Sequence, residues 1–276
     1  MRRRYIMVAV WALAVICPGP AAAQGDLERA RKLYNSGQFE ESIAAATVAK
    51  SRPAAIASAT LIIARSRLER FRTLSDPKEL AAARAELVSL NPRSLGPQEA
   101  IEWQIGVGAV LFLEGQLGPA AEMFTTVLPA ARSRLAPVEL EKLLEWWAST
   151  LARLAESLIG EARRSAYQRL RVDVRLELER NPLSRPATYW AVVAMRGAGD
   201  LDAAWGAAAA GWIRSGHQPE GTQLRTDLDR FVTQTLIPER AQARTGQRLD
   251  AKATLTDIAT LTEEWRALTE RWGGAP

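Results

Sequence analysis

The sequence predicts an all-α protein, and three features carry that prediction. Alanine, leucine, arginine and glutamate, which are among the strongest helix formers, dominate the chain. No window alternates apolar and polar residues with β-branched enrichment, as a half-buried strand would. Proline and glycine fall between periodic segments of roughly 10–20 residues, so they mark the ends of helices.

Residues 1–23 are interpreted as a cleaved export signal. Arginines at positions 2–4 form its positive region, about 13 apolar residues follow, and Ala23 closes a small-residue site for signal peptidase. The apolar run is shorter than the roughly 20 residues of a spanning helix, which disfavours a membrane anchor. Lipidation of Cys17 is disfavoured because Ile16 precedes it, where lipoprotein signals carry a small residue. We expect cleavage after Ala23 and a periplasmic or secreted mature chain.

Charge and composition exclude several classes of protein. The chain has 36 basic and 31 acidic residues, for a net charge of +5, and without the three signal arginines the balance is 33 against 31. That near-neutral balance lacks the basic surplus with which proteins neutralise nucleic-acid phosphates. One cysteine and one histidine exclude a disulfide scaffold and a Cys/His metal site. We therefore expect no nucleic acid, no metal and no cofactor.

The longest helical segment, residues 137–180, carries a strict apolar stripe. Its members recur every three or four residues: Leu140, Leu144, Trp147, Leu151, Leu154 and Leu158. Interspersed charges exclude a transmembrane span. Such a stripe is typical of a helix that packs on a core, and three heptads of it would also suit a coiled coil in an oligomer. Core packing is the favoured interpretation of the two.

Three segments repeat one pattern, a helix, a Gly-x-apolar turn and a second helix with small residues early. The turn glycines are Gly37, Gly115 and Gly199. The pattern resembles the tetratricopeptide repeat, a two-helix hairpin that stacks into a solenoid. In the central copy, Gly108 matches the small residue of the first helix and Phe124 the large residue of the second. The resemblance implies a solenoid of antiparallel helical hairpins with degenerate repeats.

The chain departs from that pattern in places. Ser42 stands where the first copy should have alanine, and Val192 where the third should have a small residue. Residues 53–91 and 137–181 are interpreted as further hairpins that lack the glycine turn. We expect the solenoid to cover residues 26–216. Residues 217–276 are expected to form a C-terminal extension or cap, with a flexible stretch at 240–250 and a last helix from near Ala253.

The resemblance also implies a binding surface, because the first helices of such hairpins line a concave groove. The positions that correspond are Leu27, Arg31, Tyr34, Glu102, Ile105, Ala109, Phe112, Tyr189, Val193 and Arg196. Tyr34, Phe112 and Tyr189 offer area for stacking, and Arg31 and Arg196 are suited to grip a carboxylate. We expect a protein partner with an extended segment that carries apolar anchors and an acidic or C-terminal group. Alternatively, Phe112 and Tyr189 pack between hairpins.

No catalytic constellation is found in the sequence. A Ser-His-Asp arrangement would have to use His217, the only histidine, which lies in a Gly/Pro loop and is interpreted as solvated. The leading hypothesis is a non-enzymatic interaction or scaffold module of the bacterial envelope. The alternative is a carbohydrate- or peptidoglycan-binding helical domain that uses exposed tryptophans. The candidates for that role are Trp103, Trp146, Trp147, Trp190, Trp205, Trp212, Trp265 and Trp272, which we expect to be mostly core residues.

Overall fold

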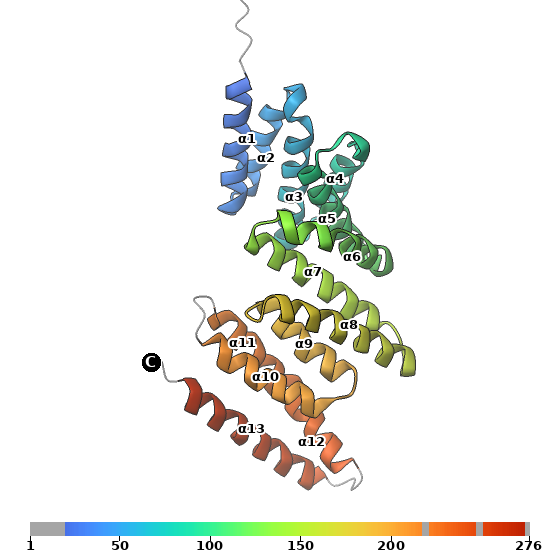
Figure 1. Cartoon of the computed structure of the whole chain (residues 1–276), viewed down its shortest axis with the longest axis vertical. Coiled ribbons are helices and arrows are strands. Elements are labelled where there is room, and N and C mark those ends of the chain that lie inside the picture. The colour runs from blue at the N-terminus through green and yellow to red at the C-terminus, as the bar shows by residue number, and fades with distance from the viewer. Residues whose placement is uncertain (1–19, 217–220, 247–250, 274–276) are drawn as a thin grey trace, which may run out of the picture. The chain divides into compact units, whose positions relative to one another are not determined.

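The computed structural model describes residues 20–216, 221–246 and 251–273, nearly all of them helical (Figure 1). Within these ranges no residue forms a strand, so the all-α prediction is confirmed. The chain divides into two compact units, Met1–Leu95 and Gly96–Pro276. Residues 1–19 of the predicted export signal lie outside the described ranges, and residues 20–23 begin the first helix. Cleavage of the signal therefore stays a prediction.

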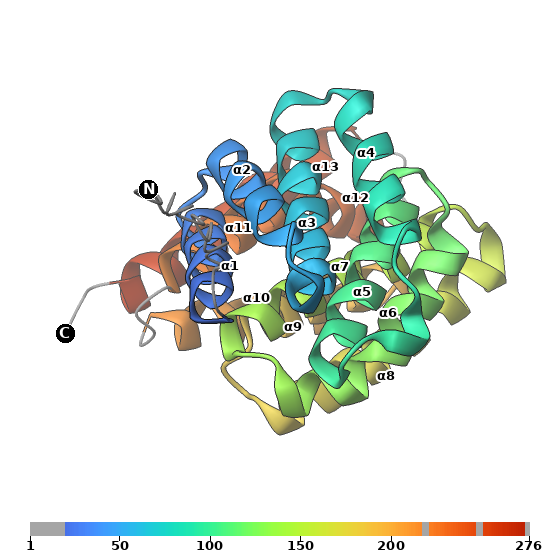
Figure 2. The same cartoon turned by 90° about the horizontal axis from the view of Figure 1, so that it is seen from above.

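The first unit is a run of helices in which each packs against the next. They are α1 (Pro20–Asn35), α2 (Phe39–Lys50), α3 (Ile56–Leu74) and α4 (Pro77–Val88), with 3₁₀ turns at Pro53–Ala55 and Pro92–Ser94. Helix α1 also contacts α3, and the view in Figure 2 shows α1, α2 and α3 side by side. Their core is built from fully buried alanines, among them Ala30, Ala46 and Ala59. Such small side chains let helix backbones approach closely.

Two polar groups inside the first unit are satisfied by neighbouring helices. The Ser42 hydroxyl donates to the Ala30 carbonyl oxygen at 2.9 Å and accepts from the Ser66 hydroxyl at 3.1 Å. Serine is therefore tolerated where the repeat pattern expects alanine, because its hydroxyl links three helices. The buried carboxylate of Glu79 accepts from Arg67 at 3.0 Å and from Arg70 at 2.9 Å. These ion pairs connect α3 to α4.

The second unit continues the same order of packing. It contains α5 (Pro97–Leu113), α6 (Leu117–Arg134), α7 (Pro137–Glu156), α8 (Gly160–Arg180), α9 (Arg185–Gly197), α10 (Leu201–Ser215), α11 (Gly221–Phe231), α12 (Ile237–Thr245) and α13 (Ala251–Gly273). Each helix from α5 to α10 contacts the one that follows it. The alternate helices also meet, since α7 contacts both α5 and α9, and α9 contacts α11.

The turns between paired helices use left-handed backbone. Gly37, Gly115 and Gly199 have φ of +77°, +79° and +89°, which L-residues with a Cβ rarely adopt, so the three predicted glycine turns are confirmed. The two hairpins without the motif make the same kind of turn with other residues. Ser75 ends α3 with φ of +54°, and Gly160 at the start of α8 has φ of +56°.

Gly108 marks the close helix contact that the repeat pattern predicts. A Cβ at this position would lie 2.7 Å from the Phe124 ring, which is fully buried. Hence α5 and α6 approach each other over a glycine, with the ring of Phe124 laid across it. The sequence did not reveal the equivalent contact between α8 and α9, where a Cβ added at Gly197 would clash with the fully buried ring of Tyr167.

The apolar stripe of residues 137–158 packs against other helices of the same chain. Leu144 and Trp147 are buried, while Leu140, Leu151, Leu154 and Leu158 are half-buried. Helix α7 packs against α6, α8 and α9, so the core-packing interpretation is confirmed for this stripe. The helix also ends earlier than the stripe, at Glu156.

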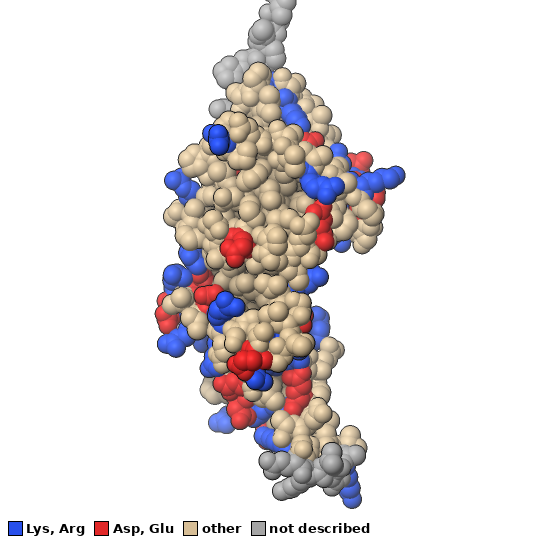
Figure 3. All heavy atoms as spheres, turned by 90° about the vertical axis from the view of Figure 1, so that its right-hand side faces the viewer, with Lys and Arg blue, Asp and Glu red and all other residues tan. Residues whose placement is uncertain are grey.

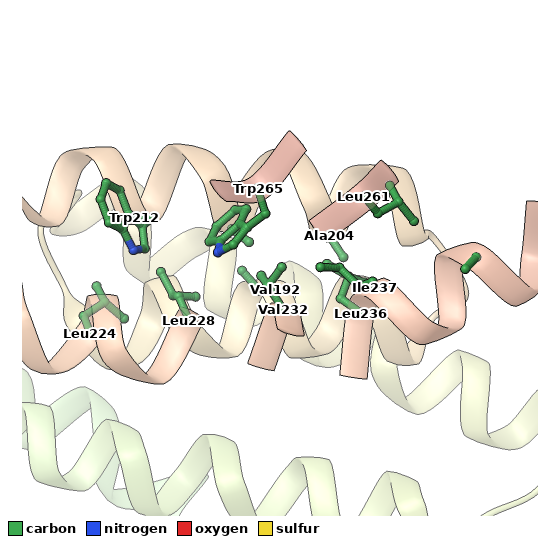
Figure 4. Packing of buried hydrophobic residues seen from close by; sticks show 12 residues of the cluster. Val192, Ala204, Trp212, Leu224, Leu228, Val232, Leu236, Ile237, Leu261 and Trp265 are labelled. Atoms are coloured by element: carbon green, nitrogen blue, oxygen red, sulfur yellow. The ribbon is translucent and has the colours of Figure 1, made fainter. Parts of the chain in front are cut away.

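The C-terminal residues belong to the second unit, so the predicted boundary at 216/217 does not separate compact units. Their core joins Leu224 and Leu228 of α11 and Leu261 and Trp265 of α13 to Trp212 of α10 (Figure 4). Contacts of α13 with α10 and α12 fit the predicted cap.

The expected flexible stretch at 240–250 is wrong in its first half, because residues 240–245 form the end of α12. Arg240 is held there by its ion pair with Asp202 and by the Trp205 ring, whose centroid lies 4.6 Å from the guanidinium carbon. Residues 247–250 lie outside the described ranges.

A π-helical segment, Val232–Leu236, connects α11 to α12. The Ile237 amide donates to the Val232 carbonyl, an i→i−5 bond. Pro238 follows directly and has no amide hydrogen to offer, so the ordinary ladder is interrupted at this point. The wider turn keeps Val232, Leu236 and Ile237 buried on one side of an otherwise continuous helix.

Candidate interaction surface

Two of the predicted binding residues, Arg31 and Tyr34, lie on α1 in the first unit. Arg31 is exposed. Tyr34 is half-buried: its ring lies 5.7 Å from that of Phe39, and the Arg65 guanidinium covers it at 4.7 Å from the centroid. Tyr34 is therefore already packed by its own unit, and Arg31 remains available on the surface of α1.

Four predicted residues lie on α5 in the second unit: Glu102, Ile105, Ala109, which is buried, and Phe112. Glu102 and Ile105 are half-buried, and Glu102 accepts a hydrogen bond from the Gln98 amide at 3.2 Å. Phe112 meets Trp146 of α7 edge-to-face at 5.1 Å and carries the Arg153 guanidinium over its face at 4.6 Å. The alternative that Phe112 packs between hairpins is thus the arrangement found.

Tyr189 of α9 lies at the centre of an aromatic group. Its ring makes T-shaped contacts with Trp190 at 5.4 Å and with Phe231 of α11 at 5.8 Å. All three side chains are half-buried, so part of each remains in contact with solvent. The predicted residue therefore both packs between hairpins and contributes to an exposed aromatic surface.

Arg196, predicted to grip a partner's carboxylate, instead binds a carboxylate of its own chain. Its guanidinium pairs in bidentate fashion with Glu239 of α12. That hydrogen bond, opposed by burial, raises the pKa of Arg196 and keeps it charged. The residue links α9 to α12, and its predicted role in binding a partner stays a prediction.

Two carboxylates that the sequence did not single out lie on either side of Tyr189 and Trp190. The Trp190 Nε1 donates to Oε2 of Glu145 on α7 at 2.9 Å. Asp227 of α11 accepts from the Gln223 side-chain amide at 3.0 and 3.1 Å. We call the group formed by Glu145, Tyr189, Trp190, Asp227 and Phe231 the α7–α9–α11 surface.

The two carboxylates influence the ionisation of the α7–α9–α11 surface. Glu145 is exposed as a residue, yet crowding by its neighbours desolvates the carboxylate and raises its pKa; the Trp190 hydrogen bond lowers the pKa and the charge of Asp227 raises it. Burial raises the pKa of Tyr189 first, and the charges of Asp227 and Glu145 add to that effect. The charge of Arg230 partly offsets these effects, because it lowers the pKa of Tyr189.

Sequence reasoning missed Glu145 and Asp227 for an identifiable reason. The groove positions were counted from the turn glycines, and the hairpin of residues 137–181 was taken to have none. Gly160 is the turn residue that would have placed α7 in the same register. For α11 no such signal exists, because the helix continues through the π segment instead of turning.

The tryptophans divide by exposure. Trp147, Trp212 and Trp265 are buried at 4%, 5% and 4%, which confirms the core interpretation for these three. The half-buried ones are Trp103, Trp146, Trp190 and Trp205. Trp272 near the end of α13 is 53% exposed. The carbohydrate-binding alternative stays a prediction, with four half-buried tryptophans and one exposed tryptophan among the described residues.

The remaining features concern the single histidine, metal binding, membrane spans and surface charge. His217 lies outside the described residues. Across the described ranges, no three His, Cys, Asp or Glu side chains gather closely enough to hold a metal ion. Among the described helices, none combines the length and apolarity needed to cross a bilayer. Lys and Arg are interspersed with Asp and Glu on the face shown in Figure 3.

The fold and this surface define an all-α protein whose helices pack in chain order and whose alternate helices present aromatic and acidic side chains together. No known protein family matches the sequence, and neither the curated proteins nor the solved structures contain a significant match.

Proposed function

We propose that this protein is a non-enzymatic interaction module, a tetratricopeptide-like solenoid that binds an extended segment of a partner protein. The observation that carries the proposal is the contact of alternate helices, because it places side chains of α7, α9 and α11 on one shared surface. Aromatic residues are enriched at protein interfaces, where their side chains bury a large area. Trp190, Tyr189 and Phe231 supply three of them within one contiguous group.

Two features support the tetratricopeptide-like assignment. The turn between the two helices of each hairpin from α1–α2 to α9–α10 contains a residue with left-handed backbone. Helices α5 and α6 are in close contact where Gly108 faces Phe124. In solenoids of this kind each hairpin contacts its neighbours in the chain, and the first helices form the binding side. The corresponding helices of the second unit are α5, α7, α9 and α11.

We place this module in the bacterial periplasm or cell envelope because of the export signal predicted for residues 1–23. Its positive start, short apolar run and Ala23 cleavage site support that location. Intact-mass measurement of the protein from a periplasmic fraction tests it. A chain that begins at Gln24 is expected, and a retained Met1 or a lipid on Cys17 would contradict the proposal.

Site-specific photo-crosslinking in cells tests the binding surface. A photoreactive amino acid at Gln223, exposed on α11 beside Asp227, is expected to capture a partner protein. The matched control position is Val172, 58% exposed on α8. Adducts from position 223 and none from position 172 support the proposal. Adducts from position 172 alone, or from neither, would reject it.

A further inference from the structure

The charges on the α7–α9–α11 surface are incompletely balanced. None of the described cations forms an ion pair with Glu145, whose carboxylate receives the neutral indole N–H of Trp190. Asp227 has Arg230 at 3.6 Å, but the Arg230 side chain is 62% exposed and the contact is longer than a direct hydrogen bond. Two carboxylates therefore share this surface with one loosely held arginine.

The aromatic rings of this surface differ from several others in the described part of the chain. Arginine guanidinium groups cover Tyr34 at 4.7 Å, Phe112 at 4.6 Å and Trp205 at 4.6 Å. None of the described arginines lies over Tyr189 or Trp190. Both residues are half-buried, and carboxylates lie near them. An aromatic face flanked by carboxylates is a favourable environment for a cationic side chain.

We infer that the α7–α9–α11 surface docks an extended partner segment through a lysine or arginine side chain, which stacks on Tyr189 and Trp190 and pairs with Glu145 and Asp227. This inference rests on the proposed function and changes the partner chemistry expected from the sequence. The acidic partner was expected because of Arg31 and Arg196. Arg31 lies on α1 in the other unit, and the Arg196 guanidinium is occupied by Glu239. Charge complementarity now favours the opposite sign, because an acidic segment would meet two like charges.

Fluorescence anisotropy with three matched peptides tests the inference. They share one extended apolar scaffold and differ at two positions, which hold lysine, glutamine or glutamate. The lysine peptide is expected to bind the full-length protein most tightly of the three. Its affinity is expected to fall as the salt concentration rises, because exposed charges are screened. Equal affinity for the three peptides, preference for the glutamate peptide, or no binding of the lysine peptide would overturn it.

Charge-removing variants locate the binding to this surface. The double variant Glu145→Gln, Asp227→Asn is expected to bind the lysine peptide with about tenfold lower affinity than the wild type. Its affinity for the glutamine peptide is expected to be unchanged. The control Glu263→Gln removes a carboxylate that is fully exposed on α13 and paired with Arg266 within its own helix. It is expected to change affinity by less than about twofold. Unchanged binding of the lysine peptide in the double variant, with helicity retained, would overturn the inference.

The crosslinked partner separates this inference from the proposed function. Mass spectrometry of the adduct at position 223 identifies the segment that was captured. A segment with lysine or arginine supports the inference. A segment that lacks both, or a second copy of this chain, would overturn the inference while a captured protein still supports the binding surface. Failure to capture anything counts against the proposed function itself.

Discussion

Glu145 is a carboxylate that accepts a hydrogen bond from an indole N–H and has another carboxylate nearby. Among the described residues, no cation forms an ion pair with it. Desolvation, followed by the charge of Asp227, raises its pKa above the ordinary 4.5, so the folded state binds a proton more tightly than the unfolded chain does. The free energy of unfolding therefore falls as pH rises from 4.5 through the raised pKa. Such a group is better suited to meeting a partner's cation than to stabilising the fold.

The variant Glu145→Gln is expected to be at least as stable as the wild type at neutral pH. Its amide oxygen still accepts from Trp190, and the destabilising charge is gone. The stability difference from wild type should disappear below about pH 4.5, where the wild-type carboxyl is protonated in both states. Urea unfolding across that pH range measures it. A variant that is less stable at neutral pH than in acid, relative to wild type, would contradict this account of Glu145.

Gly108 provides the most direct test of the helix contact. Gly108→Ala is expected to lower the free energy of unfolding by about 1–3 kcal/mol, because the new methyl group overpacks the buried Phe124 ring. The matched control is Gly206→Ala in α10, where a Cβ meets nothing within 4 Å. That change should stabilise by up to about 1 kcal/mol through helix propensity. Chemical denaturation followed by circular dichroism compares them, and equal effects would contradict the close contact.

Residue-level prediction from sequence succeeded where the signal was local and failed where it was not. Gly108 and Phe124 were found because a repeat pattern fixes their spacing within one hairpin. Glu145 and Trp190 are 45 residues apart, and their hydrogen bond depends on the register of α7 against α9. The ion pair of Arg196 with Glu239 was missed for the same reason, since the two residues are 43 positions apart and lie on α9 and α12.

At the scale of elements, helix α13 stabilises the second unit through one face. Leu261 and Trp265 are buried, and the Trp265 Nε1 donates to Asp229 of α11 at 3.0 Å. The opposite face is exposed and largely polar, as in the terminal helix of a repeat array. The helix therefore covers apolar surface on α10, α11 and α12 that would otherwise meet water.

Two leucines of α13 give a matched test of that role. Leu261→Ala is expected to lower the free energy of unfolding by about 2–5 kcal/mol, because Leu261 is fully buried. Leu255→Ala changes the same residue type on the same helix, but Leu255 is 68% exposed, and the cost should stay within about 0.5 kcal/mol. Thermal and urea unfolding measure both. A large effect at Leu255, or none at Leu261, would show that α13 does not pack in this way.

Element boundaries were predictable where turn chemistry marks them. The glycine turns at Gly37, Gly115 and Gly199 and the all-helical content followed from the sequence. The last turns of α12 could not be predicted from the sequence, because residues 240–245 are largely polar and resemble a loop. Their helix is held by tertiary contacts, with Ala241 buried and Arg240 between Asp202 and Trp205.

At the scale of the whole molecule, the chain consists of two units with separate cores and a common order of packing. The first core is built mostly from alanines and the second from larger side chains such as Leu228 and Trp265. The division at Leu95/Gly96 was not predicted, since both sides carry helical patterns and hairpin signals of the same kind. The second unit brings aromatic and acidic groups together on alternate helices at the α7–α9–α11 surface.

The central claim is that a partner binds across the α7–α9–α11 surface, and hydroxyl-radical footprinting with the captured partner tests it most directly. Partner binding should reduce oxidation of Tyr189, Trp190 and Phe231, since half-exposed rings that become covered lose contact with solvent. Trp272, 53% exposed on α13, serves as the internal reference and should be oxidised equally with and without partner. Protection of Trp272 with no change at Tyr189, Trp190 and Phe231 would contradict the claim.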